Sequence, residues 1–394
     1  MYETLCKWSI LLTIANFILS ILEFTESGFL RFVPALSYFM NLFTWVMLIL
    51  MGQKSSNSGK LSKWLYIWSG YVLVSALLMP NAIEGTVKTI LQSLYWISAF
   101  FIARFWFKAK KNNSNIDKEI LIVFYIFIVV SLYKIFVSPP YVNDYGMMVG
   151  NNVVFFPLLL LPWVVSIKSV TSRRIALVAV VVVALFSLKR SAVIVVFVTI
   201  LILAFNKQLS IKKSGFISKF GALIVFTIVG GFLLFSPKSP LESVEERFST
   251  ISEDKGSGRM DIYEQVLYLY DSFDPINKAF GKGFKRVQYD LTYGTNDVSL
   301  SSHNDYIEVL YDYGIVGLII YIVIQLILVT TSIKYIKQKC RLGVASLISI
   351  VSVIILSMVS HLVIYPTYFL FASAFWAYAE VEYQKETLLN NYNR

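Results

Sequence analysis

Apolar windows of about 20 residues recur along almost the whole chain, separated by short polar or basic connections. A helix of that length crosses the hydrocarbon core of a bilayer, so each window predicts a membrane-spanning helix. The predicted spans are 8–24, 32–51, 63–79, 88–107, 118–137, 150–167, 174–188, 190–205, 217–235, 313–333, 342–363 and 366–379. The pattern therefore predicts an all-α integral membrane protein of about twelve transmembrane helices, with residues 1–394 forming one polytopic domain.

One long polar segment, residues 236–312, interrupts this pattern between the ninth and tenth predicted helices. Within it, residues 259–273 form an amphipathic run, which predicts a short helix in a folded loop. The predicted apolar face of that helix comprises Tyr263, Val266, Leu267 and Tyr270. Ordered loops of this length usually carry function, so the chemistry is expected here.

Composition places the chain in lipid. It is 57% hydrophobic and 15% charged, with a mean hydropathy of +0.66. The formal net charge is +11, but the basic residues lie in scattered clusters between apolar runs, a pattern that argues against a nucleic-acid partner. Lys7 precedes an apolar run without a small-residue cleavage site, which indicates a retained first span.

The basic clusters also predict an orientation, because Lys and Arg gather in the cytoplasmic connections of membrane proteins. One side holds most of them, including residues 54–63, 108–111, 168–174, 207–213 and 334–341. If that side is cytoplasmic, both termini are cytoplasmic and the loop 236–312 is extracytoplasmic. Cys6 and Cys340 then both face the cytoplasm, so no disulfide or thiolate metal site is expected.

His303 is the first candidate for chemistry. Ser302 and Asp305 are spaced like a capping box, which predicts His303 in the first turn of a short helix. A helix N-terminus disfavours imidazolium, so the ring would be held neutral and able to accept a proton. The alternative is a surface histidine that merely caps a helix.

Two arginines are candidates for binding an anion. Arg190 lies beside Lys189 at a polar break between two short spans, on the side that is otherwise poor in cations. Arg259 follows Gly256-Ser257-Gly258 at the start of the amphipathic run, where backbone N–H groups and a guanidinium would suit a phosphate. The alternatives are snorkelling of Arg190 to lipid headgroups and an ordinary turn before Arg259.

Two further features favour structural roles. Gly281-Lys282-Gly283 lacks the Lys-Ser/Thr pair and the βαβ context of a nucleotide-binding loop, so it is predicted to be a turn. His361, the only other histidine, lies at the end of a span and is predicted to be packed, with a proton relay or a substrate contact as the alternative. Two histidines without a cysteine cluster make a protein zinc site improbable, and no metal is expected.

These motifs together resemble the bacterial O-antigen polymerases (Wzy) and O-antigen ligases (WaaL). His303-Asn304, nine residues and Gly314-Ile315-Val316-Gly317 are similar to the H-N-x9-G-x-x-G signature of that family. In order along the chain, three more segments resemble its motifs, Lys189-Arg190-Ser191, Ser257-Gly258-Arg259 and Gly281-Lys282-Gly283-Phe284. The resemblance extends over about residues 151–378, whereas the first 150 residues match only in being hydrophobic.

The resemblance implies a glycosyltransferase of the bacterial inner membrane that uses no metal, nucleotide or other cofactor. Its donor and acceptor would be undecaprenyl pyrophosphate-linked glycans, and a chain-length regulator is implied as a further partner. His303 would be the general base that takes a proton from the acceptor hydroxyl. Arg190 and Arg259 would hold the pyrophosphate and stabilise its charge while the glycosidic bond breaks with inversion.

The resemblance alone leaves the acceptor open between a second lipid-linked repeat unit, for a polymerase, and lipid A-core, for a ligase. Leu318 stands where ligases tend to have a small or β-branched residue, which favours the polymerase. A flippase of the same lipid-linked glycan is a third hypothesis, although the chain has no internal two-fold repeat. Secondary candidates for substrate contact are Asn304, Asp305, Lys285, Arg286, Asn151 and Asn152.

Overall fold

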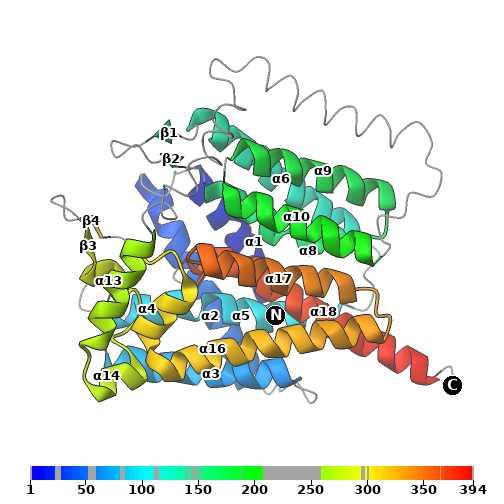
Figure 1. Cartoon of the computed structure of the whole chain (residues 1–394). Coiled ribbons are helices and arrows are strands. Elements are labelled where there is room, and N and C mark those ends of the chain that lie inside the picture. Colours follow the sequence, from blue (N-terminus) through cyan, green and yellow to red (C-terminus); the bar gives the residue numbers. More distant parts are fainter. Residues whose placement is uncertain are drawn as a thin grey trace. The chain divides into compact units, whose positions relative to one another are not determined.

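The structure is a computed structural model that describes residues 2–22, 28–51, 59–79, 85–110, 115–138, 141–142, 148–149, 152–187, 189–206, 259–293, 298–299, 301–363 and 365–392. These residues are almost entirely helical (Figure 1). They separate into two compact units, one formed by Met1–Ile116 with Tyr263–Arg394 and the other by Asp117–Ile262. The assignment of one polytopic domain stays a prediction.

The first unit contains the N-terminal helices and the C-terminal part of the chain from Tyr263. Its elements are α1 (Tyr2–Ile21), η2 (Gly28–Phe32), α2 (Val33–Leu50), α3 (Lys60–Leu78), α4 (Thr86–Ser93), α5 (Tyr95–Ala109), α14 (Pro275–Phe280), α15 (Arg286–Asp290), β3 (Thr292–Tyr293), β4 (Val298–Ser299), α16 (Asp305–Lys337), α17 (Gly343–Val359) and α18 (Pro366–Tyr392). In this unit α16 packs against α3, α14 and α17, and α18 packs along α5. The strands β3 and β4 form an antiparallel ladder that pairs Thr292 with Ser299.

The second unit is built around the middle helices. Its elements are α6 (Ile116–Val137), β1 (Tyr141–Val142), β2 (Met148–Val149), η3 (Asn152–Val154), α7 (Phe155–Leu159), α8 (Leu161–Val165), α9 (Val170–Phe186) and α10 (Arg190–Phe205). Here α9 packs against α8 and α10. Helix α13 (Arg259–Asp271) begins in this unit and ends in the first.

Helix occupies every predicted span except 217–235, which lies outside the described residues. Five described helices are long and apolar enough to cross a membrane, Tyr2–Ile21, Leu30–Leu50, Lys60–Leu78, Ile116–Val137 and Asp305–Lys337. Helices α4 and α5 would make a sixth as one span bent by 45°. The chain is therefore an all-α membrane protein apart from its two-residue strands, while the total of twelve spans stays a prediction.

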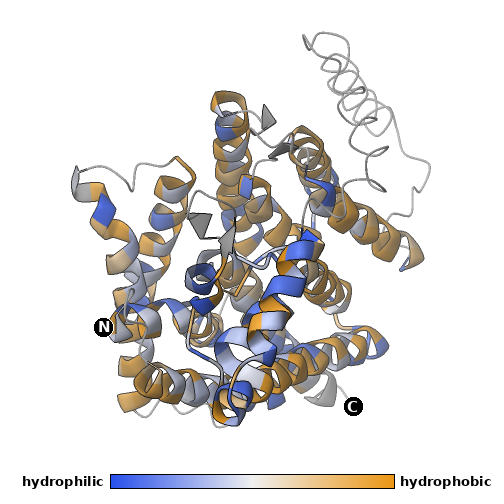
Figure 2. Cartoon of the chain, turned by 60° about the vertical axis from the view of Figure 1, so that its left-hand side comes forward, coloured by the Kyte–Doolittle hydropathy of each residue, from blue (hydrophilic) through white to orange (hydrophobic). Residues whose placement is uncertain are grey.

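Exposed apolar side chains on the helices support a lipid environment. Leu50 is 74% exposed, Leu78 70% and Phe205 83%. Hydrophobic residues cover most of the length of many helices (Figure 2). A protein surrounded by water rarely leaves many large apolar side chains uncovered, because that exposure is unfavourable. Contact with lipid tails removes the penalty, since hydrocarbon solvates these side chains as well as a protein core does.

A buried ion pair joins α5 to α18. Arg104 Nη2 lies 3.0 Å from Glu380 Oε1, and the two side chains are only 6% and 10% exposed. Glu380 also accepts a hydrogen bond of 3.3 Å from the N–H of Gly59, at the start of α3. Removing one partner of a buried pair leaves an uncompensated charge, so this contact makes the association of the two helices specific.

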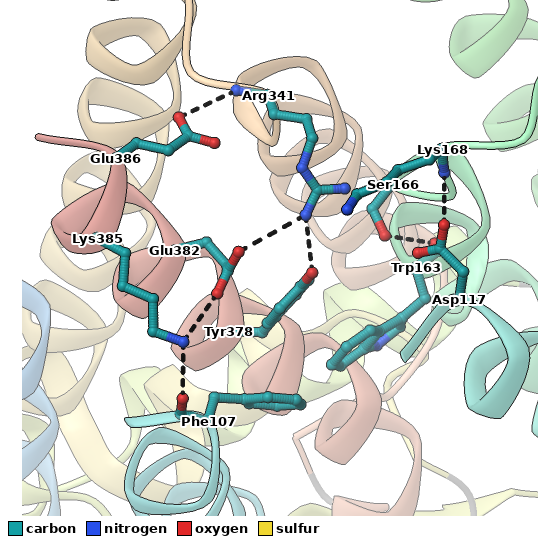
Figure 3. Close-up of polar contacts among 10 residues, drawn as sticks. All are labelled: Phe107, Asp117, Trp163, Ser166, Lys168, Arg341, Tyr378, Glu382, Lys385 and Glu386. Carbon is teal, nitrogen blue, oxygen red and sulfur yellow. Dashed lines mark hydrogen bonds and ion pairs between the residues drawn. The ribbon is translucent and has the colours of Figure 1, made fainter. Parts of the chain in front are cut away.

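Helix α18 makes further polar contacts toward its C-terminal end (Figure 3). The Arg341 guanidinium donates to the hydroxyl of Tyr378 at 2.9 Å and lies 3.8 Å from Glu382. Lys385 pairs with Glu382 at 3.1 Å and donates to the carbonyl of Phe107, also at 3.1 Å. These contacts attach α18 both to α5 and to the connection between α16 and α17.

Candidate active site

His303 lies just before α16 and not inside it, which corrects the expected position in the first helical turn. The residue that caps the helix is Asn304, whose Oδ1 accepts hydrogen bonds from the N–H groups of Tyr306, at 2.9 Å, and Ile307, at 3.3 Å. His303 itself has a positive φ of 53°. This left-handed conformation costs a non-glycine residue roughly 1–2 kcal/mol, so the surrounding contacts must hold it.

Three carboxyl groups on the first two turns of α16 form what we name the carboxylate face, Asp305, Glu308 and Asp312. Their spacing of three and four residues places them on one side of the helix. Asp305 and Glu308 are 0% exposed and Asp312 is 1% exposed. Buried carboxyl groups are stable only when they are hydrogen-bonded, so each should have a specific partner.

Each member of the carboxylate face accepts a backbone hydrogen bond from a different segment of the chain. The donors are the N–H of Val363 to Asp305 at 2.9 Å, the N–H of Ser302 to Glu308 at 2.6 Å, and the N–H groups of Lys285, Arg286 and Val287 to Asp312 at 2.6, 2.9 and 3.3 Å. The start of α16 thus anchors three segments, those that carry His361, His303 and Lys285. Asp305 was a candidate for substrate contact; it accepts the backbone hydrogen bond from Val363, and the substrate contact stays a prediction.

The Gly281-Lys282-Gly283 segment is a turn, as predicted, and it packs against the backbone around Gly314. The N–H of Lys282 donates to the carbonyl of Tyr311 at 3.2 Å. Gly281 has a φ of 79°, and a Cβ there would lie 2.3 Å from the carbonyl carbon of Asp312. Gly314 has a φ of 65°, and its Cβ would lie 2.3 Å from the carbonyl oxygen of Ala279. Two glycine motifs that are distant in the sequence are therefore needed for one close backbone contact.

Gly314 also interrupts α16. The hydropathy pattern had predicted a polar loop up to residue 312 and a separate span from residue 313 in this region. The non-helical backbone at Gly314 (φ 65°, ψ −173°) separates a short first segment from the long apolar remainder of the helix. The hydroxyl of Tyr71 on α3 donates a hydrogen bond to the carbonyl of Tyr313. This contact satisfies a carbonyl at the break in the helix.

Aromatic rings surround the segment that contains His303. The rings of His303 and His361 have centroids 4.6 Å apart, and those of His361 and Tyr365 are 4.7 Å apart. His361 Nδ1 lies 2.9 Å from the hydroxyl of Ser301. Lys285 Nζ lies 5.7 Å from the centroid of the Tyr365 ring. The structure therefore brings the two histidines of the chain together, which sequence reasoning missed because they are 58 residues apart.

Lys285 and Arg286, two of the secondary candidates for substrate contact, differ in their surroundings. Lys285 is 9% exposed and is the second site residue with a positive φ, at 60°. Arg286 Nε donates to both carboxylate oxygens of Asp290, at 2.8 and 3.0 Å, and this hydrogen bond raises the pKa of Arg286. Asp290 in turn accepts the Tyr311 hydroxyl at 2.8 Å. Arg286 is therefore engaged within the protein, whereas Lys285 faces aromatic rings.

The two arginines proposed for anion binding begin helices. Arg190 is the first residue of α10, and Arg259 is the first described residue of α13. A cation at the positive end of a helix dipole is unfavourable unless an anion joins it, so both positions suit a negatively charged ligand. Both arginines belong to the second unit and His303 to the first, so the meeting of the three stays a prediction.

The remaining predicted elements have mixed outcomes. Helix α13 confirms the predicted amphipathic helix, but its buried face includes Ile262 and Val266, while Leu267 is 41% exposed and does not belong to that face. Asn152 is exposed at the start of η3, whereas Asn151 lies outside the described residues. The described residues contain no group of three metal-ligating side chains.

Comparison with known proteins bears on the region that contains the motifs. Residues 175–322 match the family model described as O-antigen ligase (Wzy_C). No curated protein matches the chain. The matched region includes Arg190, Arg259 and His303 with Asn304, together with the glycine pair at 314 and 317. The resemblance to the Wzy/WaaL family is therefore confirmed over residues 175–322.

Proposed function

We propose that this protein is a polymerase that transfers a growing glycan from undecaprenyl pyrophosphate to the next lipid-linked repeat unit, at the outer leaflet of the bacterial inner membrane. The O-antigen ligase family match supports glycosyl transfer from a lipid-linked donor in general. The observation that carries the proposal is that His303, a residue able to act as a base, is held in a left-handed conformation between two hydrogen-bonded neighbours, Ser302 and Asn304.

In the proposed reaction the hydroxyl oxygen of the acceptor sugar attacks the anomeric carbon of the donor. His303 takes the hydroxyl proton as the new carbon–oxygen bond forms, because removal of the proton makes the oxygen a better nucleophile. The bond between the anomeric carbon and the pyrophosphate oxygen breaks, and the electron pair leaves with the pyrophosphate. Attack on the face opposite the leaving group inverts the anomeric centre.

Arg190 and Arg259 are proposed to bind the departing pyrophosphate. Negative charge on that group grows as the glycosidic bond breaks, and positive groups placed beforehand at this position lower the barrier. A guanidinium can donate two parallel hydrogen bonds to phosphate oxygens, which lysine cannot do. The helix starts at both arginines add backbone N–H groups of the same polarity.

Ligase activity, with lipid A-core as the acceptor, is the second candidate, because the matched family is described as O-antigen ligase. The test is to incubate the purified protein with defined lipid-linked repeat units alone and to separate the products by length. A ladder of polymers formed without lipid A-core supports the polymerase. If chains appear on lipid A-core but never form between repeat units, the ligase is correct and the polymerase is rejected.

A further inference from the structure

The two histidines of this chain, His303 and His361, have their rings in contact. The ring centroids are 4.6 Å apart and the planes are tilted by 40°. His361 is 8% exposed, and its ring also contacts Tyr365, with centroids 4.7 Å apart. A buried ring that touches a second ring on a neighbouring segment limits the rotations open to that neighbour.

The segment 361–363, which carries His361, is hydrogen-bonded to residues on both sides of His303. Ser301, two residues before His303, has its hydroxyl 2.9 Å from His361 Nδ1. Asp305, two residues after His303, accepts the N–H of Val363 at 2.9 Å. The segment 361–363 is therefore attached two residues before and two residues after His303, so the two histidines hold a constant relation while both bonds persist.

A base contributes to catalysis only when its nitrogen points at the proton that it removes, and misplacement by about 1 Å costs about 10²-fold in rate. We infer that His361 is a positioning residue that holds the His303 imidazole in its reactive orientation. This inference rests on the proposed function. Ring contact with His361 selects the orientation of the His303 ring, and the Ser301 hydroxyl keeps His361 in place.

The test uses the purified full-length protein, defined lipid-linked repeat units and measurement of kcat and KM. We expect His361→Ala to lower kcat about 10²-fold with KM changed less than about threefold, because the base is misplaced while the substrate still binds. His361→Phe keeps a ring against His303 and should recover at least about tenfold of that loss. Melting temperatures of the detergent-solubilised variants report whether each one is folded.

Ser301→Ala and Ser349→Ala form a matched pair that keeps the test sharp if His361→Ala does not fold. Both serines are buried, and Ser349 accepts a hydrogen bond of 2.9 Å from Trp376 Nε1, the same length as the contact between Ser301 and His361. Each variant loses one comparable buried contact. Only Ser301→Ala should lower kcat, whereas Ser349→Ala should keep wild-type kinetics.

Three outcomes would overturn the inference. Wild-type kcat in folded His361→Ala would show that His303 needs no support from this ring. A folded His361→Phe as inactive as His361→Ala would show that a nitrogen of His361 is required, as in a proton relay. Equal kcat for the two serine variants would remove the evidence for positioning. Full activity in His303→Ala would instead reject the proposed base, which separates the two failures.

Discussion

Gly281 and Gly314 each occupy a backbone conformation that is essentially closed to other residues, with φ and ψ of 79° and −175° for Gly281 and 65° and −173° for Gly314. Another residue forced into such a region costs about 1–3 kcal/mol. A Cβ at position 281 would also lie 2.3 Å from the carbonyl carbon of Asp312. Because backbone must move to relieve that overlap, a further penalty of about 1–3 kcal/mol is expected. Gly281→Ala should therefore lower the free energy of unfolding by about 2–6 kcal/mol.

Gly85→Ala provides the matched control for this prediction. Gly85 has a similar backbone conformation (φ 74°, ψ 148°), but among the described residues, its chain neighbours aside, no atom lies within 4 Å of the position that a Cβ would take there. Gly85→Ala should have only the conformational cost. The free energies of unfolding of the two variants should therefore differ by the cost of the close backbone contact, about 1–3 kcal/mol. The assay is the melting temperature of detergent-solubilised protein, in which Gly281→Ala should melt about 1–4 °C below Gly85→Ala. Equal melting temperatures would refute the interlocked-turn explanation.

Three further predictions concern the reaction and the buried ion pair. His303→Ala should lower the rate of polymer formation about 10²–10⁴-fold and leave lipid that carries single repeat units, which gel analysis of the glycans would detect; chains of normal length would reject the assignment. Arg190→Lys and Arg259→Lys should each lower kcat about 10²-fold, because lysine keeps the charge and loses the paired hydrogen bonds, whereas full activity in both would reject the pyrophosphate site. Arg104→Met should destabilise the protein by about 3–5 kcal/mol by leaving Glu380 buried and unpaired, and Arg104→Met with Glu380→Met should recover much of the loss in thermal melting.

Much of the helical structure follows from the sequence, because a membrane restricts the chain to apolar helices whose length is set by the bilayer. Each apolar window within the described residues contains helix, and α13 matches its amphipathic pattern. Hydropathy alone did not show that the window 150–167 divides into η3, α7 and α8. Pro162, in the first turn of α8, is a local signal for that division, since proline begins a helix readily and disrupts its interior.

The contacts of the candidate site were less accessible to sequence reasoning. The cap of α16 was assigned to Ser302, because local spacing does not distinguish Ser302 from Asn304 and does not show that His303 between them has a positive φ. The contact with His361 depends on tertiary packing that no local pattern reports. The carboxylate face did have a signal, since acids at 305, 308 and 312 share one side of a helix that continues into apolar residues.

The carboxylate face has a consequence for motion. Asp305, Glu308 and Asp312 are bonded to three separate segments, so a slide of α16 along its own axis by one residue would break all of these bonds together. These bonds therefore oppose sliding of the first turns of α16 past the neighbouring segments. A hinge remains at Gly314, where the helical backbone is already interrupted. A tilt at Gly314 would carry the first segment of α16 together with the three segments bonded to it, so the His303 ring would keep its neighbours during that motion.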